Sequence, residues 1–343
     1  MDRAGADVGR DKGAIPRSPG DISCTLRPVR WAERVARKLQ RRARRGDRVL
    51  VAGWFSWPAA AATAGDLLAR DVACRWLQRA GREYDVANAS PFGSGVDWRV
   101  VDPAAYSDLV FVCGPVGPAY TALQQLLERF QGSRHIGLDL TMIAPLSEWN
   151  PFDPLFERDS TRAANPDLAL AAEEPRVPVI GVVLVEPYTP EFPDRDRQDA
   201  ARGAVETLLA SVTAARVSID TRLDVNRTRL RTPGEVESLI ARMDAIVTTR
   251  LHGLVLAIKN GVPVLAIDPV AAGSKIKRQA DTLGWPAVRS ADRLEQDDLR
   301  TTLEFCLGEE ARRLARRCAE RGATRLERLR DEFVAALSEG PAR

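Results

Sequence analysis

The sequence contains few of the residues that bind metals or form disulfides. It has two histidines, His135 and His252, and five cysteines scattered over 343 residues without a Cys-x-x-Cys pair. An odd number of unclustered cysteines does not make a disulfide framework, and structural zinc sites need closely spaced cysteine or histidine ligands. We therefore expect neither, and cysteine usage of this kind fits a reducing cytoplasm.

The sequence also lacks long uncharged segments and a strong excess of charge of one sign. The longest uncharged stretch, residues 49–65, contains glycine, serine and proline, which is typical of a strand and a loop rather than a membrane span. Residues 1–25 have no apolar core of the kind found in signal peptides, and we expect a disordered tail there. The net charge of +3 gives no general attraction for nucleic acid, so no nucleic-acid partner is expected.

Apolar runs of strand length alternate with helical patterns along most of the chain, which predicts doubly wound parallel sheets. The expected strands are residues 49–55, 84–89, 109–113, 135–140, 177–185 and 217–219, and the expected helices are residues 66–79, 119–130 and 197–211. A connection rich in proline, aspartate and asparagine spans residues 143–176. We expect the tail 1–25, a Rossmann-like domain 26–160, a second Rossmann-like domain 161–295, and a helical extension 296–343.

Two further segments have amphipathic helical patterns. Residues 292–338 are heavily charged and contain one apolar stripe, formed by Leu303, Leu307, Leu314, Leu326, Leu329, Phe333 and Leu337. Residues 27–48 are strongly basic, with Trp31, Val35 and Leu39 at helical spacing. The basic segment has two interpretations, which are contact with an anionic membrane surface and packing of a solvated helix on its own domain.

The most informative segment of the chain is residues 244–269. A β-branched run at residues 245–249 is followed by an apolar helical pattern that begins with Arg250-Leu251-His252-Gly253 and stops at Asn260. A second apolar run at residues 262–267 completes a βαβ unit, so the two strands should be parallel. Arg250 and His252 then lie at the carboxyl end of a strand and the amino end of a helix, where open α/β sheets bind ligands and anions.

A cation in the first turn of a helix opposes the helix dipole, which makes Arg250 unusual for a purely structural helix start. The position is explained if a bound anion completes the site. The alternative is that Arg250 points to solvent and that His252 is an ordinary histidine at a helix end.

Three stretches of the sequence resemble the polysaccharide pyruvyl transferase family. The most specific is RLHGLVLAIKNGVPVLAIDP, which begins at Arg250 and is followed by Lys275 in GSKIKRQADTLGWP. Residues 154–170 are similar to the central segment of the family, and residues 63–81 are similar to the Gly-Asp pair that opens its first helix. Together the three stretches cover most of residues 48–290.

The resemblance implies a glycosyltransferase-B-like architecture with two Rossmann-like domains facing a cleft. It also implies transfer of the enolpyruvyl group of phosphoenolpyruvate to a saccharide or lipid-linked glycan, with closure of a pyruvyl ketal. Arg250 would clamp the donor, and His252 would be the general acid. No cofactor and no metal are expected, and the location would be the cytoplasm, with peripheral membrane contact left open.

The remaining site assignments follow from the same resemblance. Substrate binding is expected for Arg158, Lys275, Gly253, Asp66, Gly65 and Gly114. Arg158 would form a second clamp on the donor, or else a salt bridge with Asp159 or Glu157. Lys275 would neutralise phosphate, or else be a solvated lysine.

The amino-terminal opening departs from the family pattern. Trp54-Phe55-Ser56-Trp57-Pro58 and an alanine run replace the usual Gly-Asn-x-Gly-Asp, and Gly114-Pro115-Val116-Gly117 replaces a triple glycine. Trp54 and Trp57 either stack on sugar faces or belong to the core. These departures keep two alternatives open, which are a nucleotide-sugar-dependent glycosyltransferase and a non-catalytic relative that binds an anion or glycan.

Overall fold

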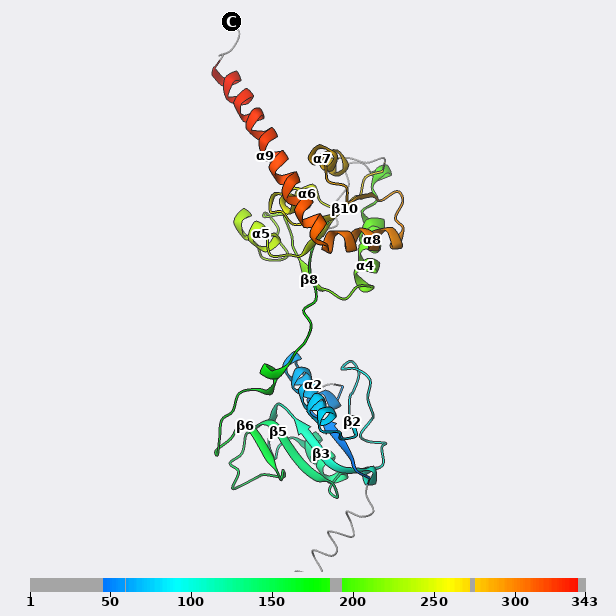
Figure 1. Cartoon of the computed structure of the whole chain (residues 1–343), viewed down its shortest axis with the longest axis vertical. Helices are drawn as coiled ribbons and strands as arrows, with labels where there is room; N and C mark the ends of the chain where they lie inside the picture. The colour runs from blue at the N-terminus through cyan, green and yellow to red at the C-terminus, as the bar shows by residue number, and fades with distance from the viewer. Residues whose placement is uncertain (1–45, 59, 186–192, 272–274, 339–343) are drawn as a thin grey trace, which may run out of the picture. The chain divides into compact units, whose positions relative to one another are not determined.

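The structure is a computed structural model that describes residues 46–58, 60–185, 193–271 and 275–338. The chain divides into two compact units, which are Met1–Glu174 and Pro175–Arg343. Each unit is described by itself (Figure 1). The expected tail 1–25 and the basic segment up to residue 45 lie outside the described residues. The membrane interpretation of that segment therefore stays a prediction.

The first unit is built on a wholly parallel sheet. Its strand order is β2-β1-β3-β5, with β4 and β6 also paired to β5. The strands are β1 (Arg48–Ala52), β2 (Tyr84–Val86), β3 (Tyr106–Val112), β4 (Pro115–Val116), β5 (Arg134–Met142) and β6 (Leu155–Asp159). Both β3 and β4 pair with β5, so they act as one strand interrupted by Cys113 and Gly114, whose φ angles are 62° and 86°.

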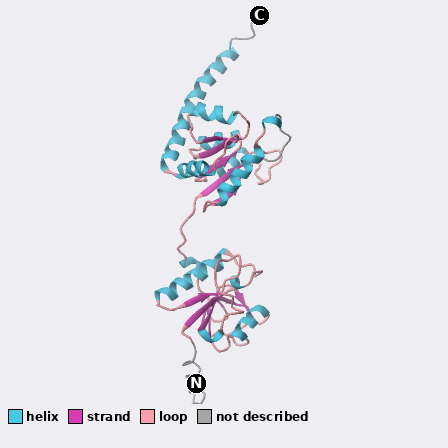
Figure 2. Cartoon of the chain, turned by 90° about the vertical axis from the view of Figure 1, so that its right-hand side faces the viewer, coloured by secondary structure: helices cyan, strands magenta, loops and turns pink. Residues whose placement is uncertain are grey.

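Helices cover the two faces of this sheet (Figure 2). Side chains alternate along β3, so that Leu109 and Phe111 share a core with α3 (Thr121–Arg129) while Val110 and Val112 share one with α2 (Ala64–Arg79). Thr63 caps α2, because its hydroxyl accepts a hydrogen bond from the Asp66 N–H at 3.4 Å. Short 3₁₀ turns, η1 (Trp54–Ser56), η2 (Pro103–Ala105) and η3 (Leu168–Ala171), complete the unit.

The second unit has a parallel five-stranded sheet of order β11-β10-β9-β7-β8. Its strands are β7 (Val179–Val183), β8 (Ala215–Ser218), β9 (Ala245–Thr248), β10 (Val264–Asp268) and β11 (Val288–Ser290). The surrounding elements are η4 (Pro193–Arg195), α4 (Gln198–Ala210), α5 (Pro233–Ile240), α6 (Leu251–Lys259) and α7 (Lys275–Leu283). The predicted βαβ unit is confirmed, because α6 joins β9 to β10 and these two strands are parallel neighbours.

The carboxyl-terminal helices belong partly to the core of the second unit. Gly308 separates α8 (Gln296–Leu307) from α9 (Glu309–Ser338). Buried side chains of α8 and of the first half of α9 pack in that core, among them Leu303 and Ala315. The predicted apolar stripe continues beyond them as exposed side chains, Leu326, Leu329, Phe333 and Leu337, on the part of α9 that extends away from its unit (Figure 1).

The predicted fold class is confirmed as two parallel-sheet α/β units with carboxyl-terminal helices. The division between them differs from the expected boundary at residue 160, although it falls inside the 143–176 connection. That connection is not structureless, since it contains β6 and η3. Leu168 of η3 is buried in the core beneath α2, and this packing keeps residues 161–174 with the first unit.

Within the described ranges, no helix is both long enough and apolar enough to cross a membrane.

Candidate functional site

Arg250 lies where β9 ends and α6 begins, as the sequence predicted. Its backbone N–H donates to the Thr248 hydroxyl at 2.9 Å, and the same hydroxyl donates to the Val183 carbonyl of β7 at 2.8 Å. Arg250 occupies the N-cap position without a side-chain cap. The first N–H groups of a helix have no partner within the helix, so this end of α6 favours a bound anion.

The Arg250 guanidinium has one ion-pair partner among the described residues. Its Nη1 lies 3.4 Å from Oδ1 of Asp220, which follows β8 and is buried. Asp220 also accepts hydrogen bonds from the backbone N–H groups of Arg222 at 2.9 Å and Arg227 at 3.3 Å, so the carboxylate is fixed. The guanidinium contact is long, and the Arg250 side chain keeps 21% of its surface exposed. Arg250 is therefore held at the edge of the sheet and is reachable by a ligand.

His252 and Lys275 lie at the same edge of the sheet as Arg250. His252 is an exposed residue in the first turn of α6, and Lys275 is the exposed first residue of α7. These helices follow the neighbouring parallel strands β9 and β10, so their amino ends meet one edge of the sheet. The structure thus brings together three of the predicted donor-side residues.

Gly253 is explained by close packing. A Cβ at this position would lie 2.1 Å from the Thr248 hydroxyl oxygen and 3.1 Å from a methyl carbon of Val183. Only a glycine lets the first turn of α6 approach β9 and β7 this closely. The predicted contact between Gly253 and substrate stays a prediction.

Arg158 lies in the first unit, at the end of β6. Its guanidinium donates to Asp167 at 2.6 Å and to the Thr141 hydroxyl at 2.7 Å, and it lies 3.4 Å from Asp159. The predicted salt bridge with Asp159 is thus present, while Glu157 pairs with Arg162 instead at 2.7 Å. Asp167, nine residues further on, is the closer partner, and no sequence pattern marks it.

The residues expected on the acceptor side have structural roles within the first unit. The Asp66 carboxylate accepts hydrogen bonds from the backbone N–H and the hydroxyl of Thr63, both at 2.7 Å, and so caps α2. Gly114 has φ of 86°, and a Cβ there would lie 2.4 Å from the Trp54 indole. Gly65 has ordinary space around it, and nothing in the structure explains a glycine at this position.

Trp54 and Trp57 belong to an aromatic cluster of the first unit. Their ring centroids lie 5.7 Å apart, and that of Trp54 lies 5.0 Å from Tyr120. Trp57 is 8% exposed, and the Trp54 Nε1 donates to the Pro115 carbonyl at 3.2 Å. The core interpretation therefore holds for Trp57, and Trp54 packs against the same core.

A thiol and two carboxyl groups meet beside Arg158. One ligand atom each of Cys113, Asp139 and Asp167 lies within 4.8 Å of the others. Burial, together with the charges of Asp66 and Asp139, raises the pKa of the Cys113 thiol to about 12. Burial also raises the pKa of Asp139, and the neighbouring Asp167 adds to this shift. The Cys113 thiol therefore stays protonated near neutral pH.

The same three residues have the ligand chemistry of a cation site. Arg158 Nη1 already lies 2.6 Å from Asp167 and 3.8 Å from the Cys113 sulfur, so a guanidinium supplies positive charge here. This grouping is not apparent in the sequence because its members come from three separate segments. The predicted independence from metal stays a prediction.

Two parallel sheets, each with charged side chains at the carboxyl ends of its strands, define an α/β protein of two Rossmann-like units. Residues 166–269 match the family model described as polysaccharide pyruvyl transferase. This confirms the predicted resemblance over a segment that includes Asp220, Arg250, His252 and Gly253, and it supports a transferase. Lys275 and the predicted residues of the first unit lie outside the match.

Several solved structures resemble the chain at low identity. The calicheamicin glycosyltransferase CalG4 is 15% identical, with 87% of this chain and 100% of that chain covered and a TM-score of 0.34. The spinosyn forosaminyltransferase SpnP is 18% identical, with 83% and 99% covered and a TM-score of 0.29. UDP-GlcNAc 2-epimerase from Methanocaldococcus jannaschii is 9% identical, with 82% and 99% covered and a TM-score of 0.30. A comparison with curated protein sequences gives no significant match.

Proposed function

We propose that this protein transfers pyruvate from phosphoenolpyruvate to hydroxyl groups of a saccharide or glycan precursor, forming a pyruvyl ketal. The observation that carries the proposal is the position of Arg250 and His252 at the β9–α6 junction, inside the segment that matches the pyruvyl transferase family. The neighbouring cations Arg250 and Lys275 and the uncapped amino end of α6 would favour binding of a small, highly charged anionic donor.

Arg250 would bind the donor through its planar guanidinium. Arginine matches carboxylate and phosphate with two parallel hydrogen bonds, which a lysine ammonium cannot reproduce. The 3.4 Å contact with Asp220 would keep this side chain in place before the donor binds. Lys275, at the start of α7, would add charge toward the phosphate.

His252 would supply the proton that starts the reaction. Protonation of carbon 3 of the enol creates an oxocarbenium-like centre at carbon 2, to which an acceptor hydroxyl adds with loss of its proton. A second hydroxyl then displaces phosphate and closes the ketal. A histidine is suited to the first step because its imidazole transfers protons near neutral pH, and His252 is exposed at the helix start.

The role of His252 can be tested by proton uptake and by turnover. A bound trianion beside the imidazole favours its charged form, so donor binding should take up a proton near neutral pH. Calorimetry of phosphoenolpyruvate binding in buffers of different ionisation enthalpy should show less uptake for His252→Gln than for the wild type. Turnover of the variant should fall by roughly 10²–10⁴-fold if His252 is a general acid. Equal uptake together with near-normal turnover would remove His252 from the mechanism.

The choice of donor can be tested by ligand-dependent stability. A ligand stabilises a protein only if it binds the native state, so phosphoenolpyruvate should raise the melting temperature of the full-length chain more than a panel of nucleotide sugars. Arg250→Lys should lower kcat/KM for phosphoenolpyruvate strongly, while the exposed Arg293→Lys in the same unit provides a matched control. Stabilisation by a nucleotide sugar alone would favour a glycosyltransferase instead.

A further inference from the structure

The α2 face of the first sheet is incompletely covered. The chain passes from β5 to β6 through residues 143–154 without a helix, and Leu146, Trp149 and Phe152 of this loop pack on the α3 side. On the opposite face of the sheet, residues of the strands beside α2 therefore line a cavity. The exposed side chain of Phe156, from β6, forms part of its wall.

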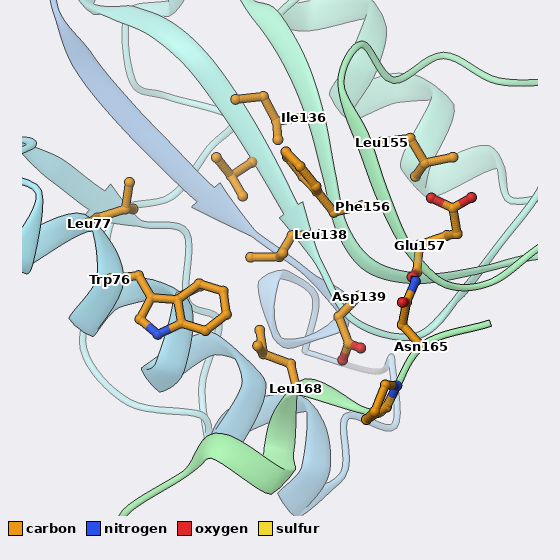
Figure 3. A pocket seen from close by; sticks show the side chains of 13 residues that line it. Trp76, Leu77, Ile136, Leu138, Asp139, Leu155, Phe156, Glu157, Asn165 and Leu168 are labelled. Carbon is orange, nitrogen blue, oxygen red and sulfur yellow. The ribbon is translucent and has the colours of Figure 1, made fainter. Parts of the chain in front are cut away.

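This cavity has a volume of about 620 Å³, which is typical of small-molecule sites. Its walls are mainly apolar, with Trp76 and Leu77 from α2 and Ile136 and Leu138 from β5 (Figure 3). The Trp76 side chain is half-exposed, so the cavity is open to solvent on that side. An apolar molecule entering it would be removed from water on several sides, which is favourable.

A break in β5 places Asp139 in the wall of this cavity. The pairing between β5 and β6 shifts register around Leu138 and Leu140, and Asp139 has a left-handed φ of 59°. Before the break Leu138 packs with the α2 core, and after it Leu140 packs with the opposite core. Bulges of this kind re-aim a side chain and are frequent beside ligand sites.

Asp139 is polar but has an unsatisfied atom. It is 5% exposed, and its Oδ2 has no hydrogen-bond partner among the described residues. A buried oxygen of this kind is unfavourable unless a donor reaches it. Glu157, the other acid of the wall, is already paired with Arg162, so Asp139 is the group that a ligand would satisfy.

The surroundings of Asp139 carry more negative than positive charge. Asp167 and the capping carboxylate of Asp66 lie near Cys113, and Arg158 is the guanidinium that pairs with Asp167. An anionic ligand would therefore be repelled, whereas a hydroxyl or ammonium group could donate to the free oxygen.

We propose that this cavity binds a small, mainly apolar molecule whose one polar group donates a hydrogen bond to Asp139. The cavity supplies the apolar walls and Asp139 supplies the acceptor, while the adjacent carboxylates exclude acids. The site lies wholly within the first unit, and the inference does not depend on pyruvyl transfer.

The test is calorimetric binding of three matched probes to the full-length protein. We expect 2-(1-naphthyl)ethylamine and 2-(1-naphthyl)ethanol to bind at one site and 1-naphthylacetate to bind at least about tenfold more weakly, the difference expected for one hydrogen bond to a charged group. A preference for the amine over the alcohol, or the reverse, would identify the donor group.

Two variants separate the polar contact from the apolar walls. Glycine readily adopts the left-handed backbone conformation at this position. Asp139→Gly should weaken binding of the amine and the alcohol about ten- to hundredfold, which removes their higher affinity relative to the acetate. Trp76→Ala should weaken all three probes and keep their ranking. The exposed Asp47→Asn is the matched control, and its affinities should not change.

Several outcomes would overturn the proposal. They are no saturable binding of any probe, equal affinity for the acetate, and unchanged affinities in Asp139→Gly. If that variant does not fold, Asp139→Asn replaces it, because asparagine tolerates the left-handed region. The ammonium probe should then lose affinity in the variant, and an unchanged affinity would contradict the role of Asp139.

Discussion

Gly253→Ala is the sharpest test of why the motif after β9 contains a glycine. The added methyl group would lie 2.1 Å from the Thr248 hydroxyl oxygen, more than an ångström inside normal contact. That oxygen is held on both sides, since it donates to the Val183 carbonyl at 2.8 Å and accepts from the Arg250 N–H at 2.9 Å. The hydroxyl cannot move without losing one of these bonds.

The expected loss of stability combines two effects. Inserting a methyl group into a well-packed region typically costs about 1–3 kcal/mol, and one lost hydrogen bond adds about 0.5–1.5 kcal/mol. We expect the free energy of unfolding of the second unit to fall by about 2–4 kcal/mol. Denaturant unfolding, followed by a probe in that unit such as the buried Trp285, would measure the change.

Two comparisons make this measurement specific. Gly203 lies inside α4 of the same unit, with open space where a Cβ would lie, so Gly203→Ala should stabilise the unit by about 0.5–1 kcal/mol. Adding Thr248→Ala to Gly253→Ala should recover part of the loss, because it removes the clashing oxygen. If Gly253→Ala unfolds within about 0.5 kcal/mol of the wild type, the packing argument is wrong.

Three further predictions concern the first unit. The Arg162 guanidinium lowers the pKa of Glu157 to about 2 from its usual 4.5, so this pair stabilises the fold above pH 4.5 and the effect is lost as the pH falls toward 2. Glu157→Gln should therefore show a shallower loss of stability over that range, and an unchanged acid titration would contradict the pairing. Cys113 has a pKa raised to about 12, so mass spectrometry should find it unmodified by iodoacetamide at pH 8 in the native protein and modified after unfolding, whereas rapid native modification would refute its burial. The charge of Arg158 lowers the pKa of Asp139 and so partly offsets the increase caused by burial. Arg158→Ala should therefore raise that pKa further, and the free energy of unfolding should fall more steeply as the pH rises above 3.8, the usual pKa of this carboxyl group. A stability profile that matches the wild type would show that this charge does not act on Asp139.

Much of the fold is predictable from the sequence because strands and helices leave regular patterns. The run after Asp244 predicted the β9–α6–β10 unit, and the apolar runs of strand length predicted β1, β3, β5 and β7. The short strands β4, β6 and β11 escaped prediction. The strands β4 and β11 have only two and three residues, too few to show periodicity, and β6 lies in a polar, proline-rich segment.

Residues of the candidate site could be predicted where the local sequence determines their position. They could not be predicted where contacts between distant segments determine it. The strand-to-helix junction fixes the position of Arg250 at the sheet edge without any long-range information. Asp220, its partner, is distant in sequence, and the meeting of Cys113, Asp139 and Asp167 needs three segments to converge. Asp139 is an acid inside the apolar run of β5, and this was a visible signal in the sequence, because aspartate is rarely fully buried unless it is paired.

Each unit is made from one continuous stretch of sequence, with the division at residues 174 and 175. Calorimetric heating should therefore produce two separable melting transitions, and a single melting temperature would not describe the protein. A ligand that binds one unit should shift the transition of that unit alone. Phosphoenolpyruvate and the naphthyl probes should then act on different transitions, which assigns each ligand to its unit before any complex is crystallised.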